Sequence, residues 1–229
     1  MKTLTIAFFG ATLVALAAVS PAAPSPLKGR GGKEFVQVQT PLSGSGVASG
    51  EANLGNLVAD AVRQTGHAQI GLVPADEINA KAQVAAGKTD PNSIIGTLRF
   101  ADDPSDTVVV LNLTGAQLVK VAERSVSRAP QPFDGFLQVS GFQIRYSPGQ
   151  PEGKRVSLSS AEGSALDLSR TYRVATTRPI AGGSLGYFQI WSQKDIAEDT
   201  GIPLAKSLGE YLNAHRTVNS TIEGRISTR

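Results

Sequence analysis

The segment from Gly50 to Arg63 constrains the fold of this chain most strongly, because it predicts an amphipathic helix with an unusual polar start. Its apolar residues recur at the spacing of a single helix face: Leu54, Leu57, Val58, Ala61 and Val62. Gly66 follows them and is typical of a helix end. Asn53 and Asn56 fall in the first turn, where short amides cap helices and bind neighbouring loops. We therefore expect both amides to be structural.

The rest of the chain mixes short apolar strands with two further amphipathic helices. Apolar or alternating runs predict strands near residues 36–38, 70–73, 107–113, 137–146, 156–158 and 172–174. The run 137–146 is interrupted at Ser140-Gly141, as at a bulge. A capping box at Thr114 and Gln117 predicts one helix, and Pro203 opens another. This order predicts an α+β (mixed α/β) fold and not a regular doubly wound sheet.

Composition narrows the class of protein. The chain has 229 residues, of which 41% are hydrophobic and 18% charged, as in a globular domain of ordinary size. Its net charge of +3 is small and its basic residues are scattered, so we expect no nucleic-acid partner. It has no cysteine, so disulfides cannot contribute to its stability.

The N-terminus has the pattern of an export signal. Lys2 precedes an apolar, alanine-rich run from Leu4 to Val19, and Ser20-Pro21-Ala22 fits a cleavage site. We expect a signal peptide at 1–22, a flexible spacer at 23–33 and one domain at 34–229. The chain would then be exported to a periplasm, cell envelope or medium, with no membrane span after cleavage. An uncleaved anchor is the alternative, although the run is short for a spanning helix.

Three segments, in this order, carry a resemblance to a known family. They are the helix start Asn-Leu-Gly-Asn-Leu at 53–57, Gly-Phe-Leu-Gln-Val-Ser-Gly at 135–141 and Ala-Gly-Gly-Ser-Leu-Gly-Tyr-Phe at 181–188. Together they resemble the C-terminal, substrate-recognition domain of the 5′-nucleotidase / UDP-sugar hydrolase family. The resemblance covers about Val36 to Ile226 and implies mixed sheets packed with about three helices. In that family a metallophosphatase domain precedes this one and carries the chemistry, whereas here we expect only a leader before it.

The resemblance also implies where a ligand would bind. The family has a Gly-Gly-Asp-Gly-aromatic loop whose aromatic ring stacks on the nucleobase, and Tyr187 matches that ring, with Phe188 as a competitor. A second aromatic of the family maps near Val108, and Phe100 is a nearby candidate. Asn79 stands where the family has a substrate-binding arginine. The expected ligand-binding residues are therefore Tyr187, Phe188, Phe100 and Asn79.

The loop that contains Asn79 departs most from the family pattern. The family has Asn-x-Gly-Gly-Ile-Arg there, and this chain has Pro-Ala-Asp-Glu-Ile-Asn at 74–79. Two carboxylates replace glycines, so a nucleoside phosphate would meet negative charge in place of a guanidinium. We expect weak binding of aromatic rings, with adenosine bound at least as well as AMP. As neighbours on a loop, Asp76 and Glu77 are expected to be solvated.

The sequence gives little support for catalysis by this chain alone. Its two histidines, His67 and His215, lie far apart without metal-ligand spacing, so we expect no metal site, no cofactor and no catalytic residue. The expected function is a non-catalytic module that binds a nucleoside-like small molecule or an envelope protein. One alternative is the recognition subunit of a split hydrolase, working with a separate metallophosphatase chain. Another is a serine esterase that uses the triad Ser184, Asp195 and His215.

Overall fold

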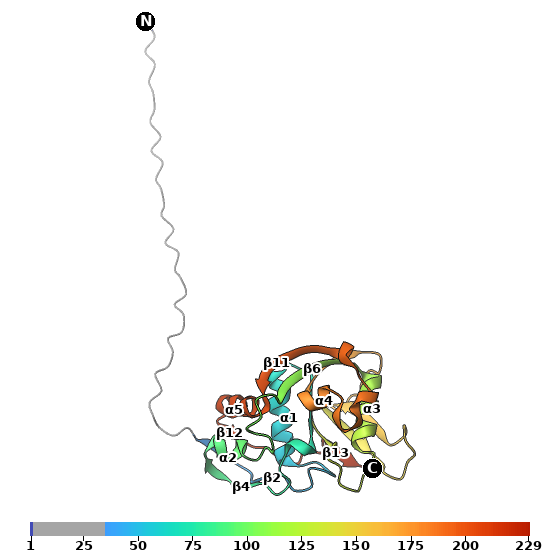
Figure 1. The fold of residues 1–229 in the computed structure, drawn as a ribbon, viewed down its shortest axis with the longest axis horizontal. Coiled ribbons are helices and arrows are strands. Elements are labelled where there is room, and N and C mark those ends of the chain that lie inside the picture. Colours follow the sequence, from blue (N-terminus) through green and yellow to red (C-terminus); the bar gives the residue numbers. More distant parts are fainter. Residues whose placement is uncertain (2–34) are drawn as a thin grey trace. The chain divides into compact units, whose positions relative to one another are not determined.

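The computed structural model describes Met1 and residues 35–229, and the latter belong to one compact unit (Figure 1). Apart from Met1, the expected signal peptide and spacer lie outside the described residues. The α-helices are α1 (Asn53–Thr65), α2 (Pro91–Ile95), α3 (Gly115–Ser125), α4 (Arg178–Ala181) and α5 (Leu204–Ala214). Three 3-10 helices accompany them: η1 (Ala75–Glu77), η2 (Ser184–Gln189) and η3 (Gln193–Asp195). The three predicted helices are α1, α3 and α5, which are the long ones, and α2 and α4 are short additions.

The strands form several small sheets around one mixed central sheet. They are β1 (Val36–Val38), β2 (Leu42–Ser43), β3 (Ile70–Pro74), β4 (Gln83–Val84), β5 (Gly87–Thr89), β6 (Thr107–Thr114), β7 (Leu137–Ser140), β8 (Phe142–Tyr146), β9 (Val156–Ser160), β10 (Thr171–Thr177), β11 (Ile196–Pro203), β12 (Thr217–Val218) and β13 (Ile226–Thr228). The central sheet has the order β11-β6-β10-β3-β7, with β10 and β3 parallel and the other pairs antiparallel. The expected α+β, mixed-sheet class is confirmed.

Helix α1 lies against the central sheet (Figure 1). Its apolar face packs on β3, β7 and β10, and its other neighbour is α5. All five residues of the predicted stripe are buried, from Leu54 to Val62. The capping box of α3 is present as predicted, because the Thr114 hydroxyl accepts from the Gln117 backbone N–H and the Gln117 side chain accepts from that of Thr114. Local sequence signals thus set the buried face of α1 and the start of α3, whereas the start of α1 has no side-chain cap from its own segment.

The break at Ser140-Gly141 moves the chain from one sheet to another. β7 pairs with β3 in the central sheet, whereas β8 pairs with β9 and β13 in a three-stranded sheet of order β13-β8-β9. Gly141 has a φ of 84°, and a Cβ there would overlap the Gln69 carbonyl oxygen. Only glycine combines this backbone angle with such a close approach.

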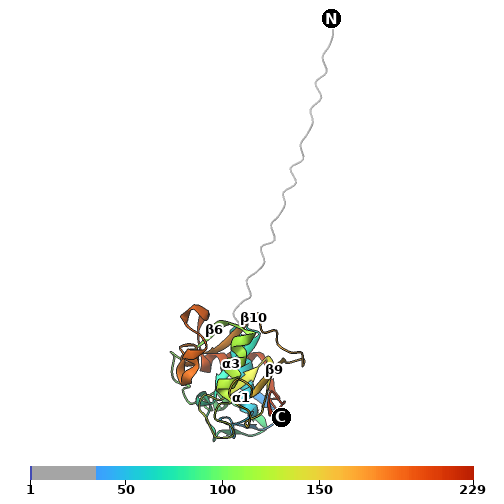
Figure 2. The ribbon, with the colours of Figure 1, turned by 90° about the vertical axis from the view of Figure 1, so that its right-hand side faces the viewer.

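The C-terminal segment closes the domain by pairing with early strands. β12 runs parallel to β1, which also pairs with β5, and β13 adds to β8. Figure 2 shows α3 and β9 on the side that faces the viewer, with the C-terminus beside them. Residues after 193 therefore add one strand to each of three sheets and supply α5, so they are part of the same compact unit.

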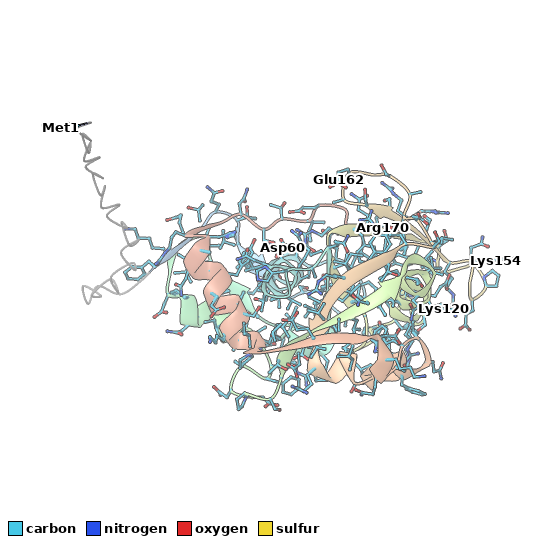
Figure 3. All side chains as sticks on the ribbon, turned by 90° about the horizontal axis from the view of Figure 1, so that it is seen from above. Met1, Asp60, Lys120, Lys154, Glu162 and Arg170 are labelled. Carbon is cyan, nitrogen blue, oxygen red and sulfur yellow. The ribbon has the colours of Figure 1, made fainter. Side chains whose placement is uncertain are left out.

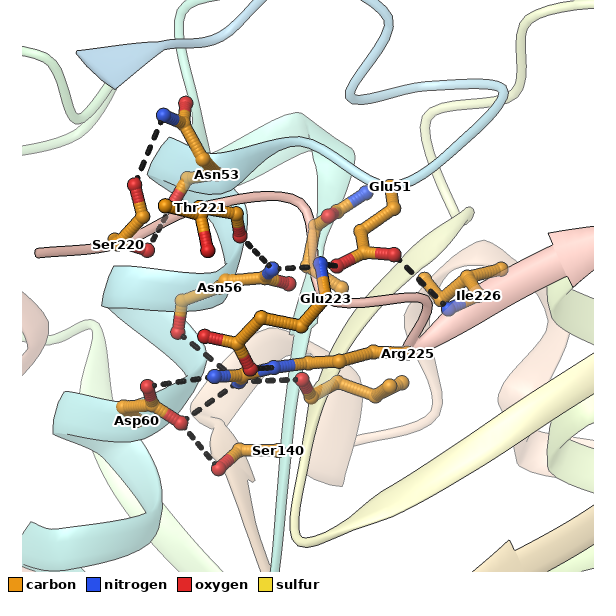
Figure 4. A network of polar contacts seen from close by, with 12 residues as sticks. Glu51, Asn53, Asn56, Asp60, Ser140, Ser220, Thr221, Glu223, Arg225 and Ile226 are labelled. Carbon is orange, nitrogen blue, oxygen red and sulfur yellow. Dashed lines mark hydrogen bonds and ion pairs between the residues drawn. The ribbon is translucent and has the colours of Figure 1, made fainter. Parts of the chain in front are cut away.

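The two amides of α1 hold this C-terminal segment in place (Figure 4). Asn53 accepts from the Ser43 backbone N–H at 2.8 Å and donates to the carbonyl oxygens of Pro41 and Ser220. Asn56 donates to Glu51 Oε1 at 2.7 Å and to the Thr221 carbonyl oxygen at 2.9 Å. Both side chains are buried, and their partners lie in β2 and in neighbouring loops, as expected for structural amides.

Gln138 joins the second motif to the first. Its side chain is fully buried, and Oε1 accepts from the Ala52 backbone N–H at 2.9 Å, just before α1. Its Nε2 donates to the carbonyl oxygens of Val47 and Gly50. Gly55 faces this amide so closely that a Cβ there would meet the Gln138 side chain. The amide therefore fills the space that the glycine leaves and organises the start of the helix.

Candidate functional site

Tyr187 lies in the core. Its side chain has 0% exposure, its hydroxyl donates to the Gly135 carbonyl oxygen at 2.8 Å, and its ring stacks on Trp191 with 5.2 Å between ring centres. Desolvation raises the pKa of the buried phenol above its usual range. A ligand ring has no access to either face in this structure. The stacking role expected of Tyr187 requires an accessible ring, and this ring is enclosed in the core.

Phe188 and Asn79 are both exposed, but they do not line a common hollow. Phe188 is 66% exposed, and its backbone N–H donates to the Gly183 carbonyl oxygen. Asn79 faces a shallow hollow beside Lys81 and Asp134, where its Oδ1 accepts from the Lys81 backbone N–H at 2.9 Å. The structure thus does not gather the four expected ligand-binding residues into one site.

Phe100 does line a partly open hollow, of about 370 Å³, which we call the Phe100 hollow. Its apolar walls are Pro74, Phe100, Pro179, Ile180 and Leu185, and its polar groups are Asp76, Glu77, Asp103, Asp106 and Ser184. The ring of Phe100 is 43% exposed, so a ligand can reach it. Apolar walls with a few polar groups are typical of a small-molecule site.

Three loops hold these walls in position. The Ala75 and Asp76 backbone N–H groups donate to the carbonyl oxygens of Phe136 and Asp134, at 2.8 and 3.0 Å. On the other side, the Arg99 backbone N–H donates to the Glu77 carbonyl oxygen at 2.8 Å. The hollow therefore rests on a loop that is fixed from both sides by the backbone.

Leu185 is held in the hollow by an unusual backbone. It has a φ of 57°, and Gly186 follows with a φ of 88°. The guanidinium of Arg124 donates twice to the Leu185 carbonyl oxygen, at 2.9 and 2.6 Å. This bidentate contact stabilises a conformation that a leucine rarely adopts.

Glu77 and Asp106 form a buried pair of acids in the wall of the hollow. Their exposures are 3% and 4%. Thr177 donates its hydroxyl to Glu77 Oε1 at 3.2 Å. Glu77 Oε2 and both carboxyl oxygens of Asp106 accept no hydrogen bond of ordinary geometry from residues 35–229, although the backbone N–H and the charge of Arg178 favour the ionised form of Asp106. Desolvation, reinforced by the other acid, raises the pKa of Glu77 to about 8. Desolvation also raises the pKa of Asp106 to about 6, so the pair holds one proton near neutral pH.

This pair corrects the expectation that both acids of the 74–79 loop are solvated. Asp76 is partly exposed and bonds Arg99 at 2.6 Å, as a solvated acid does. Glu77 instead turns inward from η1 toward Thr177 at the end of β10. Sequence reasoning missed Asp106 and Thr177 altogether. The sequence did contain one signal for Asp106. This residue directly precedes the apolar run of β6, and a residue next to a buried strand is often buried itself.

The three residues of the esterase alternative do not assemble. Ser184 lines the Phe100 hollow, and α4 separates it from the end of β10, so no strand leads directly into it. Asp195 accepts from the Ser192 backbone N–H at 2.8 Å, at the start of η3. The ring of His215 stacks on Tyr211 at the end of α5, with 4.2 Å between ring centres. In a catalytic triad the base contacts the nucleophile and the acid contacts the base, and these three side chains each have other partners.

A second hollow, of about 660 Å³, lies on the side of α1 near β8 and the loop after β9. Asp60, Glu162 and Arg170 line it and are marked in Figure 3. Of its three arginines, Arg225 is paired with Asp60 at 2.7 Å and with Glu223 at 2.9 Å, and Arg63 donates to the Ser140 hydroxyl at 2.7 Å. Its aromatic side chains, Phe142 and Tyr172, are buried, so this hollow offers no exposed ring.

Within residues 35–229, no group of three or more histidine, cysteine, aspartate or glutamate side chains is arranged to hold a metal ion. No helix in the same part of the chain has the length and apolar character of a membrane span. Neither finding bears on the residues outside that range.

Sequence comparison identifies relatives over most of the chain. The family profile described as "5′-nucleotidase, C-terminal domain" matches residues 34–193. The trifunctional nucleotide phosphoesterase protein YfkN of Bacillus subtilis is 27% identical over 190 residues, which cover 79% of this chain and 12% of that protein. A 5′-nucleotidase of Diplobatis ommata is 26% identical, with 77% of this chain and 33% of that protein covered. The chain therefore spans a third or less of the length of these two relatives.

Solved structures agree with the sequence relatives. A 5′-nucleotidase precursor from Thermus thermophilus superposes with a TM-score of 0.75 and 29% identity, covering 86% of this chain and 39% of that one. The NAD nucleotidase of Haemophilus influenzae has the same fold in this region, with a TM-score of 0.70 and 16% identity over 86% of this chain and 38% of that one. In both cases the match is to a part of a longer chain.

Proposed function

The chain belongs to the 5′-nucleotidase C-terminal domain family, and from that premise we propose that it is an exported ligand-binding form of this domain without catalysis of its own. The ligand is a nucleoside-like small molecule that offers a ring and carries no phosphate. The observation that carries the proposal is the Phe100 hollow, which combines an accessible aromatic ring with apolar walls. The proposed site residue is Phe100, in the role that the sequence suggested for Tyr187.

The charge of the hollow supports the absence of a phosphate. Asp76, Glu77, Asp103 and Asp106 all line it. The cation nearest in sequence, Arg99, is engaged by Asp76. At an effective dielectric near 20, a carboxylate about 5 Å from a phosphate costs roughly 3 kcal/mol before screening. A phosphorylated ligand would therefore bind on the order of a hundredfold more weakly than its neutral counterpart with the same ring.

Calorimetry of the purified domain with adenosine and AMP tests this proposal. We expect adenosine to bind at least as tightly as AMP, and Phe100→Ala to weaken adenosine binding by roughly fivefold to tenfold, because it removes a stacking surface. Phe188→Ala is the matched control, since it removes an equally large exposed ring outside the hollow. AMP bound more tightly than adenosine, or equal losses in both variants, would contradict the proposal.

A second candidate is the recognition subunit of a split hydrolase. It is favoured by the coverage of the relatives, because this chain corresponds to 39% or less of each longer protein described above. The partner would be a separate metallophosphatase chain that supplies the metal-dependent chemistry. The first test is whether a metallophosphatase from the same organism co-elutes with this domain. The second is whether adding the domain changes the relative activity of that metallophosphatase on different nucleotides. The envelope protein expected from the sequence would be sought in the same co-elution experiment.

A further inference from the structure

We propose that the Phe100 hollow selects an organic cation, namely a primary ammonium group carried on an aromatic or apolar ring. This inference rests on the proposed function, because it assumes that the hollow is the ligand site. It adds the charge of the ligand, which neither the family nor the relatives assign.

The position of the buried acids is the first step. Glu77 comes from the loop after β3, and Asp106 from the residue before β6, so two segments far apart in the chain bring carboxyls to the same wall. Three of their four oxygens accept no hydrogen bond of ordinary geometry from residues 35–229, and Asp106 has only the backbone N–H of Arg178 nearby. A single proton shared by the pair joins two of these three oxygens and leaves the third without a strong donor. Buried carboxyl oxygens without donors are costly in a folded protein. An ammonium group offers three N–H donors and a compensating charge.

The cations near the pair are already engaged by other acids. Arg99, next to Phe100, is engaged by Asp76. On the α4 side, Arg178 pairs with Asp199 and donates to the Thr107 hydroxyl at 3.1 Å. Asp103, the remaining acid of the wall, accepts from the backbone and hydroxyl of Ser105. Both of these arginines therefore have an acid of their own, and neither forms an ion pair with Glu77 or Asp106. Arg178 acts on Asp106 only at longer range and through its backbone N–H, and burial still raises the pKa of that acid.

The ring of Phe100 complements these acids. The guanidinium carbon of Arg99 lies 5.5 Å from its ring centre, so this ring already faces a cation at the rim. The remaining exposed part of the ring can pack on an apolar group of the ligand, and Leu185 and Ile180 add apolar surface to the same hollow. A ligand would thus place its ring against Phe100 and its ammonium toward the buried acids.

Binding would be coupled to loss of a proton. Near neutral pH the pair holds one proton, because burial raises the pKa of Glu77 to about 8. An ammonium group favours the ionised form of both acids. Part of that proton therefore passes to the buffer when the cation binds, and no other bond changes.

The test uses three ligands with the same ring: phenethylamine, 2-phenylethanol and phenylacetate. At neutral pH and low salt, calorimetry should show the amine bound at least about tenfold more tightly than the alcohol, and the carboxylate most weakly. Equal binding of amine and alcohol would overturn this inference and leave the proposed function intact. If none of the three binds and adenosine also fails to bind, the proposed function fails with it.

Variants assign the effect to the pair. The double variant Glu77→Gln/Asp106→Asn should lose the preference for the amine while retaining binding of the alcohol. Asp102→Asn, a change of the same charge on an exposed neighbour outside the hollow, should leave the preference unchanged. Persistence of the preference in the double variant would contradict the proposal.

The wild-type domain provides a readout that needs no variant. Titration of the amine in two buffers with different ionisation enthalpies should show release of a fraction of a proton per ligand bound. No dependence on the buffer would overturn the proposal even if the double variant does not fold. Glu77→Gln should abolish the release while keeping the charge of Asp106.

Discussion

Raising the pH from about 5 to about 9 should lower the free energy of unfolding by on the order of 3 kcal/mol, and Glu77→Gln should remove most of this loss. In the unfolded chain Glu77 releases its proton near its ordinary pKa of 4.5, whereas in the folded protein burial raises that pKa to about 8. Between these values the folded state binds more protons than the unfolded state. Stability is therefore fully present below the lower value and is lost as pH rises to the upper one.

Asp106 contributes in the lower part of the same window. Its ordinary pKa is 3.8, and burial raises it to about 6 in the folded protein. In Glu77→Gln we expect only this smaller loss to remain, because the amide cannot ionise but can still donate to Asp106. The variant should also be more stable than the wild type at high pH, since it removes a buried charge.

Urea unfolding at several pH values measures the effect. Glu152→Gln is the matched control, because it makes the same chemical change at an exposed position and should keep the wild-type pH profile. Constant stability of the wild type across this range, or the same decline in Glu77→Gln, would show that the pair is not buried as described.

Local patterns in the sequence carried the prediction of the fold. The 3.6-residue spacing of Leu54 to Val62 and the capping box at Thr114 depend on neighbours within one or two turns, and both helices form as predicted. The amides Asn53 and Asn56 also behave as expected, although their partners Ser220 and Thr221 lie 167 and 165 residues away. Their type and place in a first turn were enough to indicate a structural role.

The site depended on geometry that no local pattern expresses. Tyr187 and Phe188 are adjacent, and the two successive left-handed residues before them decide which ring enters the core. Similarly, Glu77 and Asp106 meet only because the β3 loop and the start of β6 converge on one hollow. The aromatic motif contributes Ser184 and Leu185 to this hollow, but the accessible ring belongs to Phe100, which comes from a different segment.

The largest effect of a single substitution is expected at Arg225, which holds the C-terminal segment against α1 (Figure 4). Its guanidinium donates to both carboxyl oxygens of Asp60, at 2.7 and 2.9 Å, and to Glu223 at 2.9 Å. It also donates to the Val139 carbonyl oxygen at 3.0 Å, so one side chain joins α1, β7 and the segment before β13. The side chains of Arg225 and Asp60 are only 13% and 21% exposed.

Arg225→Met should therefore lower the free energy of unfolding by about 3 to 5 kcal/mol, because it leaves the carboxylate of Asp60 enclosed without its cation. The matched control is Arg173→Met, which breaks an ion pair with Glu198 whose two side chains are about half exposed and should cost at most about 1 kcal/mol. Adding Asp60→Asn to Arg225→Met should recover part of the loss, since the stranded charge is then removed. Additive losses in the double variant would show that Arg225 acts through packing alone and not through its charge. Denaturant unfolding of these variants and of the wild type at neutral pH distinguishes the outcomes. The size of the effect depends on how far the carboxylate of Asp60 is removed from water.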